Sequence, residues 1–247
     1  KALKSVKSGQ VKFHPKRWEK VYFEWLGNIR DWCVSRQIWW GHQLPVFFCT
    51  KKPEVSKLQN TNHKLQENFV VSETKPKKCP FCKKCKMEQS SDVLDTWFSS
   101  ALWPFATLGW PSACAQPKNE KRKTKNLCRP LRGSDLDIFY PTQVLSTARD
   151  IINLWVARMV YSGLEFMGKD PFKDVIIHAT ILTKDGRRMS KSLGTGIDPM
   201  DLINQYGADA TRFGLIWQAQ GGQDIHWSEE HVNAGKKFAN KIWNASR

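Results

Sequence analysis

VIIHATIL, at residues 175–182, stands shortly before the basic segment Arg188-Met189-Ser190-Lys191-Ser192. Its β-branched side chains predict a buried strand of the parallel type, which seldom alternates because both of its faces are covered. Lys184-Asp185-Gly186 predicts a turn, and Asp198-Pro199 predicts the start of a helix. Ligands of open α/β sheets bind at the carboxyl ends of strands. A loop with two cations and two hydroxyls placed there suits triphosphate oxygens; the alternative is an ordinary solvated basic loop.

Patterns on both sides of this stretch predict a doubly wound α/β fold. Gln143-Val144-Leu145-Ser146-Thr147 predicts a strand, and residues 150–167 carry apolar side chains at the spacing of a packed helix. With strand 175–182 and the helix from Asp198, they give the strand–helix–strand alternation of this class. From Ser228 onward the sequence becomes amphipathic and predicts a further helix.

The first fifty residues are aromatic and less regular. Residues 1–20 predict a short β-ribbon, and residues 28–37 predict a helix that is followed by a glycine turn and a strand at 46–49. Trp39 and Trp40 suit the wall of an apolar pocket. The alternative is that both indoles belong to the core.

The formal net charge of +16 over 247 residues favours a polyanionic partner, but two segments carry most of it. Residues 51–88 hold ten Lys and four Glu, and residues 112–134 hold seven Lys and Arg against one Glu. Both segments lack a regular pattern and indicate solvated surface insertions. Nucleic-acid contact by these insertions remains the alternative.

The sequence contains no run of the roughly twenty apolar residues that a membrane span needs. The segment Lys1-Ala2-Leu3-Lys4 also lacks the apolar core of a signal peptide. The seven cysteines are an odd number, and three of them are clustered, which favours a reducing cytoplasm over a disulfide framework. We therefore expect a cytoplasmic protein without a membrane partner.

The cysteine cluster predicts a structural zinc knuckle. Cys79, Cys82 and Cys85 have the spacing of thiolate ligands for tetrahedral Zn²⁺, and Cys49 is the most obvious fourth ligand. The second pair is incomplete, because no cysteine follows Cys49 by two or three residues. We expect no catalytic zinc.

Three segments resemble the class I aminoacyl-tRNA synthetases. Residues 188–192 resemble their KMSKS signature, with arginine in place of the first lysine. Residues 28–45 resemble a pattern of the valyl/isoleucyl/leucyl subgroup, and residues 92–105 resemble its valyl branch. The resemblance covers more than half of the chain in the right order, at residues 21–48, 92–110 and 136–227.

The chain departs from the class pattern at several places. Ala148-Arg149-Asp150 stands where the class has Gly-x-Asp, and His178-Ala179 stands where it has His-Gly. The other class signature, His-x-Gly-His, is absent, since His14 and His42 have the wrong neighbours. We therefore expect the chain to be the second half of a catalytic domain, either a fragment or one piece of a split enzyme.

The resemblance implies ATP-dependent activation of valine, with ATP bound as its Mg²⁺ complex, and transfer of the valyl group to tRNA(Val). It implies Lys191 and Arg188 as catalytic residues. The implied ATP-binding residues are Met189, Ser190, Ser192, Asp150 and His178. The implied substrate-binding residues are Trp40, Asp95 and Trp97. From the residues alone, Asp95 and Asp150 could equally be helix caps, and His178 a packing or hydrogen-bonding residue.

The same resemblance implies a domain order. Residues 1–20 are expected to be the exit from an editing domain, and residues 21–227 the second half of a Rossmann-like catalytic domain. Insertions are expected at 51–91, with the zinc knuckle, and at 112–134; residues 228–247 are expected to begin a helical anticodon-binding region. Two alternatives stay open: an isoleucyl- or leucyl-tRNA synthetase, and a non-catalytic tRNA-binding paralogue. A partner chain could supply the missing half.

Overall fold

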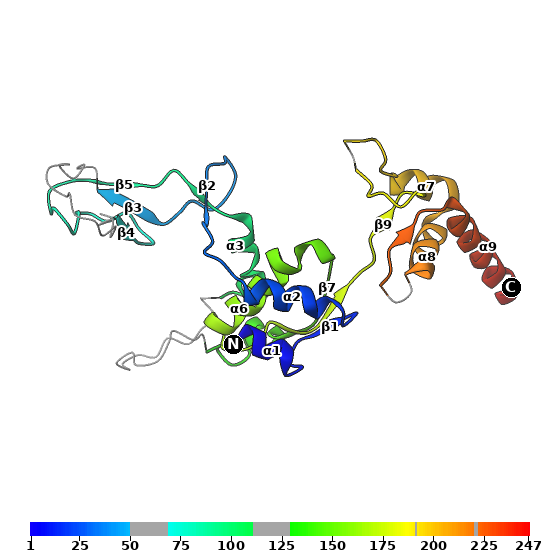
Figure 1. The fold of residues 1–247 in the computed structure, drawn as a ribbon, viewed down its shortest axis with the longest axis horizontal. Coiled ribbons are helices and arrows are strands. Elements are labelled where there is room, and N and C mark those ends of the chain that lie inside the picture. Colours follow the sequence, from blue (N-terminus) through cyan, green and yellow to red (C-terminus); the bar gives the residue numbers. More distant parts are fainter. Residues whose placement is uncertain (50–68, 111–128, 191, 220–221) are drawn as a thin grey trace. The chain divides into compact units, whose positions relative to one another are not determined.

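The computed structural model describes residues 1–49, 69–110, 129–190, 192–219 and 222–247. They divide into two compact units, and Figure 1 labels the helices and strands of both. Unit 1 comprises Lys1–Ile29 and Pro104–Arg247, and unit 2 comprises Arg30–Trp103. Each unit has its own small sheets, so each is described by itself.

A parallel three-stranded sheet forms the centre of unit 1. Its order is β1 (Lys12–His14), β8 (Phe172–Ile177) and β7 (Thr142–Thr147). Phe13 and Leu145 both lie opposite Val175, from the two sides of β8. The α/β class and the strand predicted at 143–147 are confirmed.

The connection from β7 to β8 is one helical segment with three kinds of turn. It begins as the 3₁₀ turn η1 (Arg149–Ile151), continues as the π-helical η2 (Ile152–Val156) and ends as α6 (Ala157–Phe166). The helix predicted at 150–167 is therefore confirmed in extent. Its first half departs from α geometry, as happens often beside functional sites.

The N-terminal segment differs from the predicted β-ribbon. It forms α1 (Ala2–Lys7), the sheet strand β1 and α2 (Trp18–Gly27). Phe13 and Tyr22 are fully buried, with their ring centroids 5.4 Å apart, in the core that α6 and β8 also line. Burial of each such side chain stabilises the fold by about 1.5–3 kcal/mol. Packing of residues 1–20 on the sheet is therefore favoured over the local β-ribbon that was predicted for them.

The strand predicted at 175–182 is split in two. β8 ends at Ile177, and the chain leaves the sheet before β9 (Ile181–Leu182), which pairs in parallel with β10 (Ile225–His226). The Thr180 carbonyl accepts a hydrogen bond from the Ile225 amide at 2.9 Å. Ile176 is 42% exposed, so within the described residues one face of β8 is partly uncovered.

Three longer helices complete the described part of unit 1, together with the short α5 (Asp135–Phe139) and α4 (Trp103–Ala106), whose first residue belongs to unit 2. They are α7 (Pro199–Tyr206), α8 (Ala208–Gln218) and α9 (Glu229–Ser246). The side chains of Asp198 and Ser228 cap α7 and α9, accepting hydrogen bonds from the amides of Met200 at 2.8 Å and Glu230 at 3.3 Å. Both predicted helix starts are confirmed.

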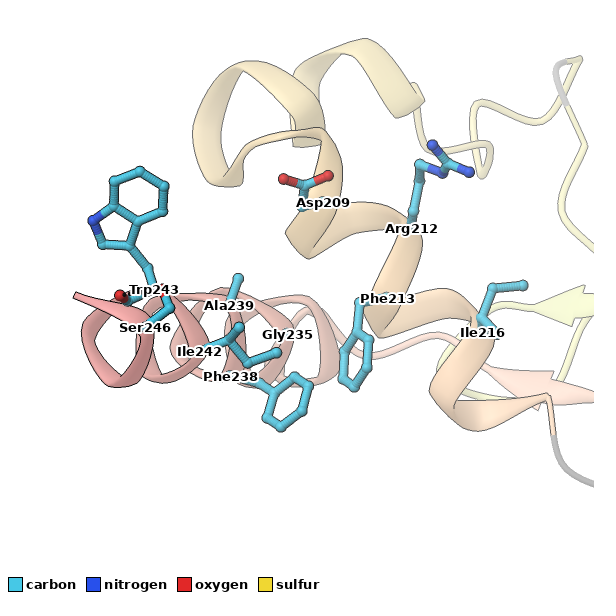
Figure 2. A pocket seen from close by; sticks show the side chains of 10 residues that line it. All are labelled: Asp209, Arg212, Phe213, Ile216, Gly235, Phe238, Ala239, Ile242, Trp243 and Ser246. Atoms are coloured by element: carbon cyan, nitrogen blue, oxygen red, sulfur yellow. Dashed lines mark hydrogen bonds between the residues drawn. The ribbon is translucent and has the colours of Figure 1, made fainter.

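α8 and α9 lie against each other at two glycines. A Cβ on Gly214 would lie 2.8 Å from the His231 carbonyl oxygen, and one on Gly235 would lie 2.7 Å from the Ala210 carbonyl oxygen. Further along, the helices border an apolar groove of about 570 Å³ (Figure 2). Its lining includes Phe213, which stacks on Phe238 at a centroid distance of 4.7 Å.

Unit 2 contains two antiparallel sheets. In one, β3 (Val46–Cys49) lies between β4 (Phe69–Val71) and β5 (Met87–Gln89); in the other, β2 (Ser35–Arg36) pairs with β6 (Val93–Leu94). The short helix α3 (Thr96–Ser100) follows β6. The strand predicted at 46–49 is confirmed.

The helix predicted at 28–37 is wrong. The helix of this region is α2, which ends at Gly27, and Ser35 and Arg36 instead pair with Leu94 and Val93. Tertiary pairing thus overrides the local pattern. Among the described residues, no helix combines the length and the apolarity that a membrane span requires.

Candidate functional site

The carboxyl ends of the three parallel strands bring chemically active side chains to one edge of the unit 1 sheet. Arg17 follows β1, Arg149 and Asp150 follow β7, and His178 follows β8. This edge is where open α/β sheets bind their ligands. The sequence therefore places at least four polar groups at the position where a nucleotide is expected.

A tight turn presents the basic segment to this edge. The Thr183 amide donates to the Arg187 carbonyl at 2.8 Å, and Gly186, at φ +83°, closes the turn. The hydroxyl of Thr183 and then the guanidinium of Arg187 lower the pKa of Asp185 below its ordinary value. Arg188 bridges back to Leu182, so the turn fixes where the basic segment begins.

Arg188 forms an ion pair with Asp150. The resemblance implied that Arg188 is catalytic and that Asp150 binds ATP, and the structure brings the two side chains together. Asp150 lies inside η1, whose N-cap is Ala148, so it is not a helix cap. Both side chains are more than half exposed and thus accessible to a ligand.

The rest of the basic segment is folded on itself. The Ser190 amide donates to the Thr195 hydroxyl at 2.9 Å, and the hydroxyls of Ser190 and Ser192 are 2.8 Å apart. Met189 is half-buried. Lys191 lies outside the described residues.

His178 is exposed, and its Nδ1 lies 2.9 Å from the Ala179 carbonyl oxygen. A carbonyl only accepts, so Nδ1 carries the proton of the neutral ring and Nε2 is the acceptor. This contact agrees with the hydrogen-bonding role that the residues alone suggested. It also leaves an acceptor nitrogen at the sheet edge.

Sequence patterns did not indicate a second group of residues at this edge. The Asp224 carboxylate accepts from Nη1 of Arg149 at 3.0 and 3.1 Å, and the Gly222 carbonyl accepts from Nη2 of Arg17 at 2.6 Å. The available signal was a glycine pair shortly before an acid and a short apolar segment, Gly221-Gly222-Gln223-Asp224-Ile225. That pattern is too common to be read without the structure.

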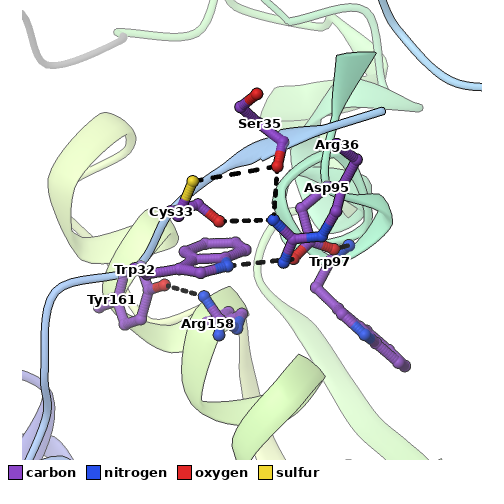
Figure 3. Close-up of polar contacts among 8 residues, drawn as sticks. All are labelled: Trp32, Cys33, Ser35, Arg36, Asp95, Trp97, Arg158 and Tyr161. Carbon is purple, nitrogen blue, oxygen red and sulfur yellow. Dashed lines mark hydrogen bonds and ion pairs between the residues drawn. The ribbon is translucent and has the colours of Figure 1, made fainter. Parts of the chain in front are cut away.

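In unit 2, Asp95 holds the predicted substrate-binding segment together (Figure 3). Asp95 is 6% exposed, and its carboxylate accepts from Nε1 of Trp32 and the amide of Trp97, both at 3.0 Å, and pairs with Arg36. Asp95 therefore caps α3, which is the helix-cap alternative that the sequence left open. All of these contacts tie residues 32–36 to the start of the helix that carries Trp97.

The two adjacent indoles of unit 2 are not core residues. Trp39 is 99% exposed and Trp40 is 88% exposed, so the core alternative is wrong. Gly41 lies close to β6, where an added Cβ would be 2.8 Å from Val93. The chain is thus fixed next to β6 directly after Trp40, and both exposed indoles are available to a ligand.

Three of the four predicted zinc ligands form one cluster, and the fourth, Cys85, hydrogen-bonds to Cys82. The thiol sulfurs of Cys49, Cys79 and Cys82 all lie within 4.8 Å of one another, and Sγ of Cys49 is 3.8 Å from Sγ of Cys82. Hydrogen bonds, first from the side chain of Cys85 and then from backbone amides, lower the Cys82 pKa to about 6. Phe47 and Met87 form the buried base of the cluster.

This arrangement fits a tetrahedral thiolate site. Four sulfurs about 2.3 Å from a zinc ion stand about 3.8 Å from one another. The Cys49–Cys82 separation has that value, and a lowered pKa favours the thiolate that binds metal. The donor set therefore suits structural Zn²⁺.

A parallel sheet with a basic segment at its carboxyl edge is the arrangement expected of a class I synthetase catalytic domain. Residues 1–228 match the family model "tRNA synthetases class I (I, L, M and V)", and the chain belongs to this family. Within it, the chain is similar to curated valine–tRNA ligases. It is 50% identical to that of Clostridium acetobutylicum over 246 residues, and 47% identical to that of Thermotoga maritima over 247 residues.

These matches include all of this chain but only 24% and 25% of the two ligases. The chain thus spans about a quarter of the length of the curated relatives it matches. Solved structures show the same fold at lower identity. The LeuRS of Agrobacterium radiobacter K84, solved in a ternary complex with tRNA and LeuAMS, has a TM-score of 0.61 at 21% identity, over 87% of this chain and 27% of that one.

A second solved structure agrees. Methionyl-tRNA synthetase of Mycobacterium tuberculosis, bound by methionyl-adenylate, has a TM-score of 0.55 at 17% identity, over 94% of this chain and 34% of that one. At these identities the likeness concerns the fold alone. The α/β catalytic fold expected from the sequence is confirmed.

Proposed function

We propose that the full-length protein containing this chain is a valine–tRNA ligase, which activates valine with ATP and transfers the valyl group to tRNA(Val). The observation that carries the proposal is the placement of Arg188, in the KMSKS-like segment, beside Asp150 at the carboxyl edge of the parallel sheet. Identity of 46–50% to valine–tRNA ligases along the whole chain supports the choice of amino acid.

The chemistry calls mainly for positioning and charge stabilisation. The valine carboxylate attacks the α-phosphate and pyrophosphate leaves, so no general base is needed. Arg188 clamps phosphate oxygens, and Lys191 neutralises the larger share of the transition-state charge. ATP enters as its Mg²⁺ complex. Met189, Ser190 and Ser192 shape the loop around the triphosphate.

Asp150 and His178 serve the nucleoside end of ATP. The Asp150 carboxylate accepts from ribose hydroxyls, and Nε2 of His178 offers a further acceptor. Without nucleotide, Asp150 pairs with Arg188, and each exchanges this partner for ATP on binding. The exchange costs little, because exposed ion pairs contribute about 0–1 kcal/mol.

Aromatic side chains of unit 2 bind the amino acid. Trp40 and Trp97 wall the valine side chain, and a wall of this kind excludes larger side chains by shape. Asp95 acts through others, since its carboxylate is already engaged by Trp32, Arg36 and the amide of Trp97. Valine–tRNA ligases are themselves the general example of such an apolar pocket, which rejects isosteric threonine by only about 10²-fold.

The domain assignments follow the same proposal. Residues 1–20 follow an editing domain and already contribute β1 to the sheet of the catalytic domain, which continues to residue 227. Residues 228–247 begin an anticodon-binding region. The cysteine cluster holds a structural Zn²⁺ that stabilises the insertion at 51–91. The rest of the enzyme comes from the same polypeptide or from a partner chain, and the protein works in the cytoplasm with translation.

A chimera tests the proposal. This chain replaces the matching 246-residue region of the Clostridium acetobutylicum ligase, and ATP–pyrophosphate exchange is measured with valine, isoleucine and leucine. We expect exchange that depends on valine. Exchange driven by isoleucine or leucine would contradict the valine assignment, and a folded chimera that binds tRNA but not ATP would support a non-catalytic paralogue instead.

A further inference from the structure

Residues 222–224, here called the strap, contact the carboxyl ends of all three parallel strands of unit 1. A Cβ on Gly222 would lie 2.7 Å from Cγ of Pro15, just after β1, and 3.6 Å from the carbonyl oxygen of Ile177, the last residue of β8. Asp224 reaches Arg149, just after β7. The strap therefore lies over the edge where the nucleotide site is proposed.

Glycine is required at the start of the strap. Gly222 has φ +71°, which other residues adopt only with strain, and Pro15 leaves no room for a side chain. Arg17 holds the same residue through its carbonyl at 2.6 Å. The indole of Trp18 lies beside the guanidinium groups of Arg17 and Arg149, at 5.5 and 6.0 Å from the ring centroid.

Asp224 forms the other end of the strap. Its carboxylate accepts from Arg149 and, at 3.4 Å, from the amide of Thr180, in the segment that joins β8 to β9. Both side chains of the Asp224–Arg149 pair are 28% exposed, about half as much as those of Asp150 and Arg188. Water therefore screens the Asp224 pair less.

The strap leads directly into the strand that supports the basic segment. Ile225 and His226 form β10, which pairs with β9, and β9 is joined to Arg188 by the turn at 183–187. The ring of His226 packs on the turn, where a Cβ on Gly186 would lie 3.0 Å from its Cε1. The position of Arg188 thus depends on β10, and β10 depends on the strap.

Two neighbouring residues of η1 hold the two ends of this path. Arg149 pairs with Asp224 at the strap, and Asp150 pairs with Arg188 at the loop. Of these two pairs, only Asp150–Arg188 involves groups that contact ATP in the proposed function. The first pair can stay intact while the second is exchanged for ligand.

We propose that Asp224, held by Arg149, is a positioning residue that sets where Arg188 meets the triphosphate. The inference rests on the proposed function, because positioning is useful only if Arg188 contacts ATP. Asp224 itself does not touch the substrate. Loss of the pair leaves the amino-acid site in unit 2 intact and displaces the loop, and displacement of about 1 Å can cost a hundredfold in rate.

Hydrogen exchange in the 247-residue chain tests the structural part without any activity. Asp224→Asn keeps the size of the side chain and removes its charge. We expect the amides of Thr183, Gly186 and Arg187, which form the turn, to exchange about tenfold faster, with those of α9 unchanged. Unchanged exchange at the turn would overturn the proposal, whatever reaction the enzyme performs.

Kinetics of the chimera test the functional part. For Asp224→Asn we expect a kcat for valine-dependent exchange at least about tenfold lower, with KM for valine unchanged, and partial recovery in the Arg149→Asp/Asp224→Arg double variant. Glu24→Gln, which removes an exposed carboxylate paired with Lys20, is the matched control and keeps the unaltered kcat.

The outcomes separate the two proposals. Wild-type kcat in folded Asp224→Asn would overturn the positioning role, whereas absence of exchange in the unsubstituted chimera would count against the proposed function. If Asp224→Asn does not fold, Arg149→Lys is the variant that tests the proposal, because it keeps the positive charge but alters the geometry of the contact with Asp224. A kcat loss in Arg149→Lys supports the role, and an unaltered kcat overturns it.

Discussion

Arg188 and Asp150 pair through groups that are 58% and 52% exposed, so solvent screens their attraction. Phosphate oxygens offer the guanidinium a stronger, charge-assisted partner, and ribose hydroxyls offer the carboxylate a donor. Under the proposed function, the pair keeps Arg188 near the nucleotide site and is exchanged for ATP when ATP binds. Asp185, whose pKa is lowered by Thr183 and Arg187, stabilises the turn that presents Arg188.

Replacement of Arg188 separates its charge from its shape. In the chimera, Arg188→Ala is expected to lower kcat/KM for ATP about a hundredfold, since it removes a donor to the developing phosphate charge. Arg188→Lys keeps the charge and restores the lysine of the class signature, so it is expected to stay within a few fold of the unsubstituted chimera. The measurement is ATP–pyrophosphate exchange at varied ATP. An Arg188→Ala rate within twofold of the parent would refute a phosphate contact.

Asp95 shows what a sequence pattern leaves open at a single residue. Asp-Thr-Trp at 95–97 suits both a polar handle and a helix cap, and the structure has the carboxylate capping α3 and also binding Trp32 and Arg36. The two latter partners are 63 and 59 residues away in sequence. No local pattern could have assigned them, because they depend on the pairing of β2 with β6.

At the scale of elements, close approach of α8 and α9 depends on glycine. Gly214→Ala would place a Cβ 2.8 Å from the His231 carbonyl oxygen. Alanine favours helices by up to about 1 kcal/mol, but overpacking against backbone costs about 1–3 kcal/mol, so we expect a net loss of stability. Urea unfolding of the 247-residue chain measures it.

The matched control is Gly196→Ala, where a Cβ would have nothing within 4 Å. We expect its free energy of unfolding to change by less than about 0.5 kcal/mol. Equal stability of the Gly214 and Gly196 variants would show that the two helices are not packed as described.

The cysteine cluster joins β3 to the segment before β5, and it should act as one element only with metal. We expect the purified 247-residue chain to retain about one zinc ion per molecule after desalting, and Cys79→Ser to lose it. Cys33→Ser is the control, because Cys33 is exposed and outside the cluster. Zinc retained by Cys79→Ser, or absent from the unsubstituted chain refolded with zinc, would refute the site.

Helices and strands were predicted correctly from sequence periodicity where the local pattern agrees with the packing in the fold. The strand at 142–147, the helical segment at 149–166 and the capped helices at 199–206 and 229–246 are of this kind. Prediction failed where partners distant in sequence decide the structure. β8 ends at Ile177 because β9 pairs with β10, and residues 12–14 form a sheet strand because β8 accepts them.

The candidate site was predictable to the same degree. The basic segment, Asp150 and the four cysteines come from short motifs, and the structure brings Arg188 to Asp150 and the thiols of Cys49, Cys79 and Cys82 to one another. The strap was not predictable, because its function depends on Arg17 and Arg149, which are 205 and 75 residues from their partners. Across the whole molecule, the residues of a site can be recognised from short sequence motifs, but the distant residues that hold them in place cannot.

The last prediction concerns the 247-residue chain by itself. Its sequence lacks His-x-Gly-His, and it spans about a quarter of the length of the ligases it matches. Doubly wound folds bind nucleotides between two halves of the sheet, so Lys191 and Arg188 alone cannot enclose ATP. We expect no valine-dependent pyrophosphate exchange from the isolated chain at concentrations where the chimera is active. Exchange by the isolated chain with nothing added would show that these residues suffice for activation, and would overturn the assignment of half the ATP site to another segment.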